Sequence, residues 1–88
     1  MLSIIVPVYN EKKYIKFILS KLIDLKEIKK QIIIVDDGSY DGTTDILKNK
    51  FIKSKFINKI IFHKKNIGKG AAIKSAQKYV KGDYVAIQ

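Results

Sequence analysis

The chain has 88 residues, no cysteine and a formal net charge of +10. Its length allows one small domain, shorter than nucleotide-binding α/β enzymes usually are. The lack of cysteine excludes a disulfide framework and a thiolate metal site. No apolar run approaches the roughly 18–20 residues of a membrane span, and the N-terminus lacks the basic region and cleavage site of a signal peptide. We therefore expect a cytoplasmic chain.

The positive charge raises the question of nucleic-acid binding, because a basic surface attracts polyanions. All 18 basic residues are lysines spread along the whole chain. None is the arginine that contacts bases and phosphates through two hydrogen bonds at once. We interpret the lysines as solvated surface, with attraction to anionic lipid head groups or to a nucleotide diphosphate as a weaker use. No specific nucleic-acid partner is predicted.

The chain begins with an apolar strand over residues 2–6, and Pro7 is expected to end its hydrogen-bonded run. Asn10 is a favourable N-cap for a helix over about residues 11–26. One apolar stripe of this helix carries Ile15, Ile18, Leu19, Leu22 and Leu25. A strand followed by an amphipathic helix is a typical first unit of an α/β sheet.

Three residues at the end of this strand have side chains suited to a nucleotide. Pro7 fixes the backbone, Tyr9 offers an aromatic face for a base, and Glu11 accepts hydrogen bonds from base or ribose. On their own they are better interpreted as a strand terminator, a half-buried tyrosine and a glutamate that suits the helix dipole. Their interpretation therefore depends on the other segments.

A second apolar strand, residues 32–35, stops at two adjacent acids, Asp36 and Asp37. Four β-branched residues in a row are typical of a strand buried on both faces of a parallel sheet. Two neighbouring carboxylates are unfavourable unless a hydrogen-bond donor, a metal ion or a helix N-terminus uses them. Open α/β sheets bind ligands beyond the carboxyl ends of their strands. This pair and the Tyr9–Glu11 segment therefore suggest a nucleotide pocket.

The residues after Asp37 predict a tight turn and a second helix over about residues 43–53. Ser39 or Asp41 is expected to cap this helix. We interpret five residues of the turn as structural: Gly38, Ser39, Asp41, Gly42 and Thr43.

The third unit is a short strand over residues 59–63, followed by a glycine turn over residues 66–70. The turn opens a helix whose free N–H groups suit a phosphate. Lys69 is either a diphosphate contact or an exposed lysine at a helix start. The turn is not a P-loop, and Ile73 stands where a dinucleotide fingerprint needs glycine or alanine. His63 is interpreted most simply as a strand-end residue.

The third helix is expected to end at Lys81-Gly82, and residues 84–88 have the composition of a buried strand. The chain thus repeats a strand–helix unit three times and adds a strand. This order predicts an α/β fold with a Rossmann-like parallel sheet and right-handed crossovers.

Four segments in this order and spacing carry a resemblance: IIVPVYNE, IIIVDDGSYDGT, NIGKGAAI and GDYVAIQ. They resemble the nucleotide-sugar half of family-2 inverting glycosyltransferases with the GT-A fold, and most of all the dolichyl- or polyprenyl-phosphate mannosyltransferase-like branch. The resemblance covers essentially all 88 residues. It implies that the chain is the N-terminal half of a GT-A fold that binds a UDP- or GDP-sugar.

The resemblance assigns nucleotide-sugar contacts to Pro7, Tyr9, Glu11, Val35, Asp36, Asp37 and Lys69. In this interpretation Asp37 accepts a hydrogen bond from the base, and the backbone around Val35 lies against the nucleoside. Asp36 orients the loop or contacts the ribose.

The family's pattern continues after the point where Gln88 stands into an Asp-x-Asp motif that holds Mg²⁺ or Mn²⁺ on the diphosphate. Neither this motif nor the carboxylate that deprotonates the acceptor lies within residues 1–88. We therefore expect no catalytic residue and no metal ligand here, weak nucleotide binding and no sugar transfer by this part alone. The resemblance favours polyprenyl phosphate at the inner face of a membrane as acceptor, or a cell-surface glycan.

Other interpretations stay open at this point. The chain could be a non-catalytic nucleotide-binding or interaction module that lacks the metal site. A phosphoacceptor receiver-like domain would need an aspartate at the end of the third strand, where His63 and Lys64 stand. Lysine-driven nucleic-acid binding would show a steep loss of affinity with salt and no sequence preference.

Overall fold

The computed structural model describes all residues from Met1 to Gln88. Four parallel strands form one sheet in the order β3-β2-β1-β4. The strands are β1 (Leu2–Val8), β2 (Lys30–Asp36), β3 (Lys59–Phe62) and β4 (Tyr84–Ile87). The helices are α1 (Ile15–Ile23), α2 (Thr43–Ile46), its π-helical continuation η1 (Leu47–Phe51) and α3 (Lys69–Gln77). The predicted Rossmann-like α/β class is confirmed.

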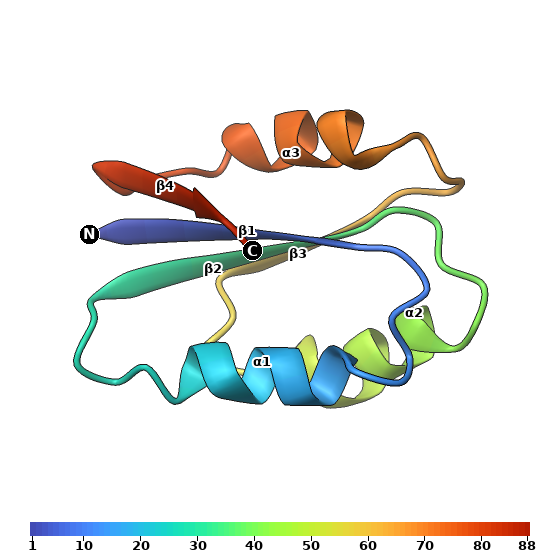
Figure 1. The fold of residues 1–88 in the computed structure, drawn as a ribbon, viewed down its shortest axis with the longest axis horizontal. Helices are drawn as coiled ribbons and strands as arrows, with labels where there is room; N and C mark the ends of the chain where they lie inside the picture. The colour runs from blue at the N-terminus through green and yellow to red at the C-terminus, as the bar shows by residue number, and fades with distance from the viewer.

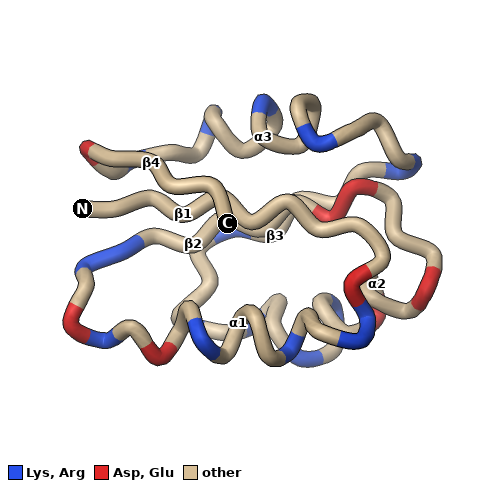
Figure 2. Tube along the Cα trace, in the orientation of Figure 1, with Lys and Arg blue, Asp and Glu red and all other residues tan.

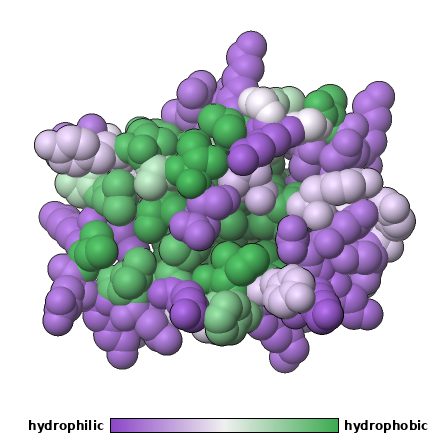
Figure 3. All heavy atoms as spheres, viewed as in Figure 1, coloured by the Kyte–Doolittle hydropathy of each residue, from purple (hydrophilic) through white to green (hydrophobic).

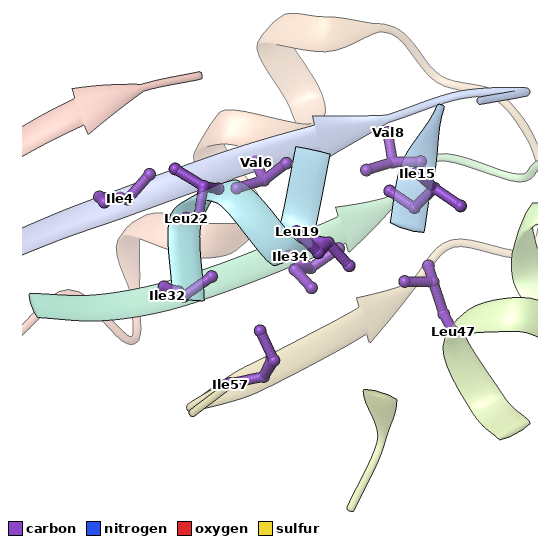
Figure 4. Packing of buried hydrophobic residues seen from close by; sticks show 10 residues of the cluster. All are labelled: Ile4, Val6, Val8, Ile15, Leu19, Leu22, Ile32, Ile34, Leu47 and Ile57. Carbon is purple, nitrogen blue, oxygen red and sulfur yellow. The ribbon is translucent and has the colours of Figure 1, made fainter. Parts of the chain in front are cut away.

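The sheet lies between two helical layers, with α1 and α2 on one face and α3 on the other (Figure 1). Alternate residues of β1 and β2 point to opposite faces, so the two central strands supply two cores. The core on the α1 side comprises Ile4, Val6, Val8, Ile15, Leu19, Leu22, Ile32, Ile34, Leu47 and Ile57 (Figure 4). The smaller core under α3 comprises Ile5, Ile33, Val35, Ala72 and Ala76. Residues 32–35 are therefore buried on both faces, as predicted.

The first strand extends past Pro7, so the prediction that Pro7 ends it is wrong. Pro7 pairs with Val35, and β1 continues to Val8, whose carbonyl accepts the Asp37 N–H. On the other side β4 pairs with β1 only as far as Ile5. Successive residues of a strand direct their backbone groups to opposite sides, so the nitrogen of Pro7 faces the β4 side. Pairing with β4 has stopped there, and the missing N–H of Pro7 therefore costs no hydrogen bond within the sheet.

The first helix starts later than predicted, and Asn10 is not its N-cap. Asn10 has a φ of +51°, and its side-chain oxygen accepts the N–H of Tyr40 instead. Residues 12–14 form turns, in which the N–H groups of Tyr14 and Ile15 both donate to the Glu11 carbonyl. The Asn10 side chain thus bonds to the neighbouring loop and does not cap the helix, and α1 begins only at Ile15.

The second predicted helix is also shorter and less regular. Gly42, with a φ of +107°, takes the N-cap position of α2, and no side chain caps that position. After Ile46 the helix widens into one π-helical turn, closed by a hydrogen bond from Ile52 N–H to the Leu47 carbonyl.

The last strand has the composition of a buried strand, but it is exposed in this structure. All four residues of β4 are exposed, and the Tyr84 side chain is 74% accessible. Strand β4 pairs only with β1, so its outer edge is open. Hydrophobic side chains accordingly gather over the sheet layer in this view, between the hydrophilic helical layers (Figure 3).

The lysines lie on both helical layers and do not form one stripe (Figure 2). This distribution agrees with the interpretation of solvated surface. None of the helices combines the length and the hydropathy that crossing a membrane requires.

The strand order places a topological switch point between β1 and β4. From β1 the chain runs through α1 to β2 and through α2 to β3. It then crosses the opposite face of the sheet through α3 and reaches β4 on the other side of β1. The connections therefore diverge beyond the carboxyl ends of β1 and β4. Open α/β sheets bind ligands in the crevice at such a point.

Replacing Ile34 with alanine tests the core on the α1 side, where Ile34 is fully buried. We expect the free energy of unfolding to fall by about 2–5 kcal/mol, because lost hydrophobic transfer adds to the effect of the cavity. Urea denaturation followed by circular dichroism measures this change. Ile52→Ala is the matched control at a 49% exposed side chain, and an equal loss in both variants would contradict the core assignment.

Candidate nucleotide site

A cavity of about 330 Å³ lies at the switch point. It is lined by Pro7, Val8, Tyr9, Glu11, Asp37, Asn66, Lys69, Ala72 and Gln88. Five of the predicted nucleotide contacts are thus brought together, from the end of β1, the end of β2 and the start of α3: Pro7, Tyr9, Glu11, Asp37 and Lys69. Their contact with a nucleotide stays a prediction.

Val35 and Asp36, the two other predicted contacts, do not line this cavity. Val35 is fully buried in the smaller core. The Asp36 carboxylate holds its own loop, since it accepts the Ser39 N–H at 3.1 Å and the Thr44 hydroxyl. The geometry therefore agrees with the loop-orienting role for Asp36, and its contact with a ribose stays a prediction.

Asp37 is the most highly bonded side chain of the site, with only 3% of its surface exposed. Its Oδ1 accepts the N–H of Ile67 at 3.0 Å and lies 2.8 Å from His63 Nδ1. Its Oδ2 accepts the N–H of Gly68 at 2.8 Å and the Asn66 side-chain amide at 2.9 Å. A carboxylate offers about four acceptor positions, so all of them are occupied.

These bonds set the protonation state of Asp37. Burial alone would raise the pKa of its carboxyl group, because it disfavours the charged form. The hydrogen bonds from His63, Ile67 and Gly68 outweigh burial and hold the pKa below its ordinary value of 3.8. Asp37 is therefore ionised at neutral pH.

His63 links Asp37 to α3 and has a role that the sequence analysis missed. An ionised carboxylate only accepts, so His63 Nδ1 carries the hydrogen in this contact. In the neutral ring Nε2 then accepts the hydroxyl of Ser75, which lies 2.9 Å away. The order Asp–His–Ser is that of a hydrolytic triad, but neither His63 nor Ser75 lines the cavity. The chain of bonds therefore positions α3 relative to the sheet.

A second set of bonds joins the loop after β1 to the loop after β2. Three successive backbone N–H groups of the first loop donate to side chains of the second. Asn10 N–H donates to Ser39 Oγ at 2.9 Å, and Glu11 N–H to Thr43 Oγ1 at 2.9 Å. Lys12 N–H donates to Asp41 Oδ2 at 3.1 Å. We call these three bonds the loop clamp.

The loop clamp changes the interpretation of the turn residues. Ser39 does not cap the second helix. Asp41 accepts the N–H of Thr43, in the first turn of α2, and also that of Lys12. Burial raises the pKa of Asp41, but the bonds from Thr43 and Lys12 outweigh it, so this pKa is lowered overall. The alternate spacing of the polar residues 39, 41 and 43 was the sequence signal for these bonds. It was interpreted only as helix capping.

Tyr9, which lines the cavity, forms an aromatic pair with Tyr40. Their ring centroids are 6.2 Å apart at an interplanar angle of 65°. Partial burial is the main cause that raises the pKa of the Tyr9 hydroxyl above 10.0, and the neighbouring Tyr40 is the second cause. The Tyr9 side chain is 42% exposed, so an aromatic face is available to a ligand.

Gly38 brings two loops into backbone contact. With a φ of +73°, it lies so close to the segment before α3 that a Cβ atom would be 2.5 Å from Asn66 N. Any side chain here would push residues 65–66 away from Asp37. The glycine therefore sets the distance between the carboxylate and the donors of that segment.

The described residues do not form a metal centre. No group of three or more histidine, aspartate or glutamate side chains is placed to hold an ion. Asp36 and Asp37 are adjacent, but the Asp36 carboxylate accepts a bond from its own loop, and the Asp37 carboxylate accepts bonds from the segment before α3. We therefore derive no metal-dependent step from these residues.

The family model for glycosyl transferase family 2 matches residues 3–88. The chain belongs to this family. Among its relatives in the family, the dolichyl-phosphate beta-glucosyltransferase of Saccharomyces cerevisiae is 37% identical over 91 residues. That alignment covers 94% of this chain but only 27% of the yeast protein. This family 2 chain thus spans about a quarter of that relative's length.

Two solved structures resemble the family 2 chain. S. aureus TarS 1-349 in complex with UDP-GlcNAc is 30% identical, with a TM-score of 0.78 over 98% of this chain and 25% of that one. The mannosyltransferase PcManGT from Pyrobaculum calidifontis, in complex with GDP-Man and Mn²⁺, has a TM-score of 0.83 at 23% identity. That match covers 96% of this chain and 25% of PcManGT, and it shows the shared fold.

Thr43→Val tests the loop clamp while keeping the shape of the side chain. It removes the oxygen that accepts the Glu11 N–H. We expect the free energy of unfolding to fall by about 1–2 kcal/mol and the Glu11 amide hydrogen to exchange faster with solvent. Hydrogen exchange by NMR measures both effects. Thr43→Ser keeps the hydroxyl and should retain most of the protection, and equal exchange in the two variants would rule out this bond.

Asp37→Asn tests the ionised carboxylate and its pH dependence. The side-chain NH₂ of the new asparagine would face the N–H groups that now donate to the carboxylate. We therefore expect the free energy of unfolding to fall by about 2–4 kcal/mol at pH 7. The pKa of Asp37 is lowered on folding, so the ionised carboxylate stabilises the fold fully at pH values above its pKa in the unfolded chain. This stabilisation is lost as the pH falls from 3.8 through the lowered pKa of the folded chain.

The difference between wild type and Asp37→Asn should therefore persist at pH 5 and shrink at pH 3. Urea unfolding at pH 7, 5 and 3 measures it. A difference that stays constant down to pH 3 would show that this pKa is not lowered.

Proposed function

We propose that this chain is the nucleotide-sugar-binding part of a glycosyltransferase that transfers a sugar from a UDP- or GDP-sugar with inversion. The observation that carries the proposal is the cavity at the switch point of a family 2 chain, lined by Tyr9, Glu11, Asp37 and Lys69. Inversion means direct displacement at the anomeric carbon, without a covalent intermediate on the enzyme.

The chemistry of the lining supports a nucleotide diphosphate. The Tyr9 ring offers a stacking face for the base, and the Glu11 carboxylate accepts hydrogen bonds from a ribose. Lys69 is the first residue of α3, where a cationic side chain and free N–H groups both favour phosphate oxygens. One wall thus suits the nucleoside and the other suits the diphosphate.

In this proposal, metal binding and deprotonation of the acceptor are performed by residues outside this chain. The Mg²⁺ or Mn²⁺ ligands and the base that deprotonates the acceptor would follow Gln88 in a longer protein. The metal would neutralise charge on the departing diphosphate. The name of the yeast relative supports a polyprenyl phosphate acceptor. With that acceptor, the proposal includes a full protein that acts in the cytoplasm at the inner face of a membrane. A cell-surface glycan is the other acceptor class.

Titration of the purified chain with UDP and GDP, with and without Mn²⁺, tests this proposal. We expect one of the two nucleotides to shift the amide NMR signals of Tyr9, Glu11 and the Asp37 loop, with little effect of the metal. Tyr9→Ala should weaken binding about tenfold, because stacking of a base on an aromatic ring contributes roughly 1–3 kcal/mol.

Tyr84→Ala is the matched control, since Tyr84 is 74% exposed on β4 and does not line the cavity. It should bind as the wild type does. A folded chain whose spectrum does not respond to millimolar UDP or GDP would contradict nucleotide binding by this part. Equal weakening by Tyr84→Ala would contradict the location of the site.

A further inference from the structure

The Asp37 carboxylate lines the proposed nucleotide cavity, but its four acceptor positions are all occupied by groups of this chain. A base that donates to Asp37 must therefore replace one of these donors. Given the proposed function, on which this inference rests, one of the four bonds must be exchangeable.

Two of the four donors are fixed by the backbone. They are the N–H groups of Ile67 and Gly68, and moving either one would displace the segment that leads into α3. That segment also packs against Gly38, where even a methyl group would meet the backbone of Asn66. Neither donor leaves without rearrangement of the loop.

The third donor is fixed by its second bond. His63 Nδ1 contacts Asp37 while Nε2 contacts Ser75 on α3. The His63 side chain is only 10% exposed and does not line the cavity. Its departure would break two bonds and release the connection between Asp37 and α3.

The fourth donor, the side-chain amide of Asn66, differs in each of these respects. Asn66 is exposed and lines the cavity. Both of its side-chain bonds go to Asp37, one to Oδ2 at 2.9 Å and one to the Asp37 carbonyl at 3.3 Å. Rotation about the side-chain bonds releases it into solvent without moving the backbone.

We propose that the Asn66 side-chain amide is an exchangeable substitute for the base at the Asp37 carboxylate. Its amide occupies Oδ2 of Asp37. On binding, a base with a ring N–H takes this position, and Asn66 rotates away. Uracil carries such a hydrogen on N3 and guanine on N1, whereas cytosine and adenine present an unprotonated nitrogen at that edge. A carboxylate acceptor therefore selects bases with a ring N–H.

The experiment compares Asn66→Ala with wild type by titration with UDP, GDP and CDP, followed by NMR of the side-chain amide groups. CDP is the matched ligand, because it differs from UDP at the edge that would meet Asp37. Asn49→Ala is the matched variant, since Asn49 is an exposed asparagine on η1 outside the cavity.

We expect UDP or GDP, but not CDP, to shift the Asn66 side-chain amide signals of the wild-type chain toward those of a solvated amide. Asn66→Ala should bind the same nucleotide at least as tightly as wild type. A gain of about two- to tenfold is expected, because no internal hydrogen bond has to be broken. Asn49→Ala should match wild type.

Two results would overturn the inference while leaving the proposed function intact. One is nucleotide binding that leaves the Asn66 amide signals unchanged or that is as strong for CDP. The other is weaker binding by a folded Asn66→Ala chain, which would make Asn66 a direct contact and not a substitute. Lack of response to any nucleotide in wild type and in both variants would instead overturn the proposed function, and this inference with it.

Discussion

The whole site depends on one buried anion, the Asp37 carboxylate. An ionised carboxylate that is 3% exposed is strongly unfavourable unless donors replace its lost water. Its donors come from β3 by way of His63, from the Asn66 side chain, and from the backbone of Ile67 and Gly68. The requirement to solvate this one charge therefore fixes where the segment before α3 runs. The same bonds keep the group charged, because they lower its pKa despite burial.

The two loops on the other side of the cavity are held by a different device. Backbone N–H groups at the start of the turn before α1 have no helical partner, and the loop clamp gives Asn10, Glu11 and Lys12 side-chain acceptors on the next loop. A loop held by several such bonds keeps its side chains in place before any ligand arrives, which lowers the ordering entropy lost on binding. The exposed Tyr9 side chain therefore projects into the cavity from backbone next to the loop clamp.

The sequence was a good guide wherever one periodicity or one strand end carried the information. Residues 32–35 predicted a strand buried on both faces, and the order of elements predicted the parallel sheet and the position of the cavity. The misses involve partners far apart in the chain. Asn10 bonds a residue thirty positions away, which no local capping rule foresees, and His63 gained its role from Asp37 and Ser75. Residues 84–88 have the composition of a buried strand but are exposed, because composition reports how apolar a strand is, not how many neighbours it has. Asn66 was overlooked because its importance follows from counting the acceptors of Asp37.

The position of α3 explains why a helix on one face can serve a cavity at the end of the sheet. Ala72 and Ala76 are fully buried, and these small side chains let the helix approach β1 and β2 closely. Beyond the helix, Gln31 accepts the Lys81 N–H and donates to the Tyr79 carbonyl, and Ser3 Oγ accepts the Gly82 N–H. A Cβ at Gly82 would lie 2.7 Å from that oxygen, so only glycine fits. This buried polar group at the amino ends of the strands anchors the C-terminal end of α3. The bonds from the Ile67 and Gly68 N–H groups to Asp37 hold its N-terminal end at the other end of the sheet. Held at both ends, α3 has little freedom to slide, and its first residue, Lys69, stays beside the carboxyl end of β1.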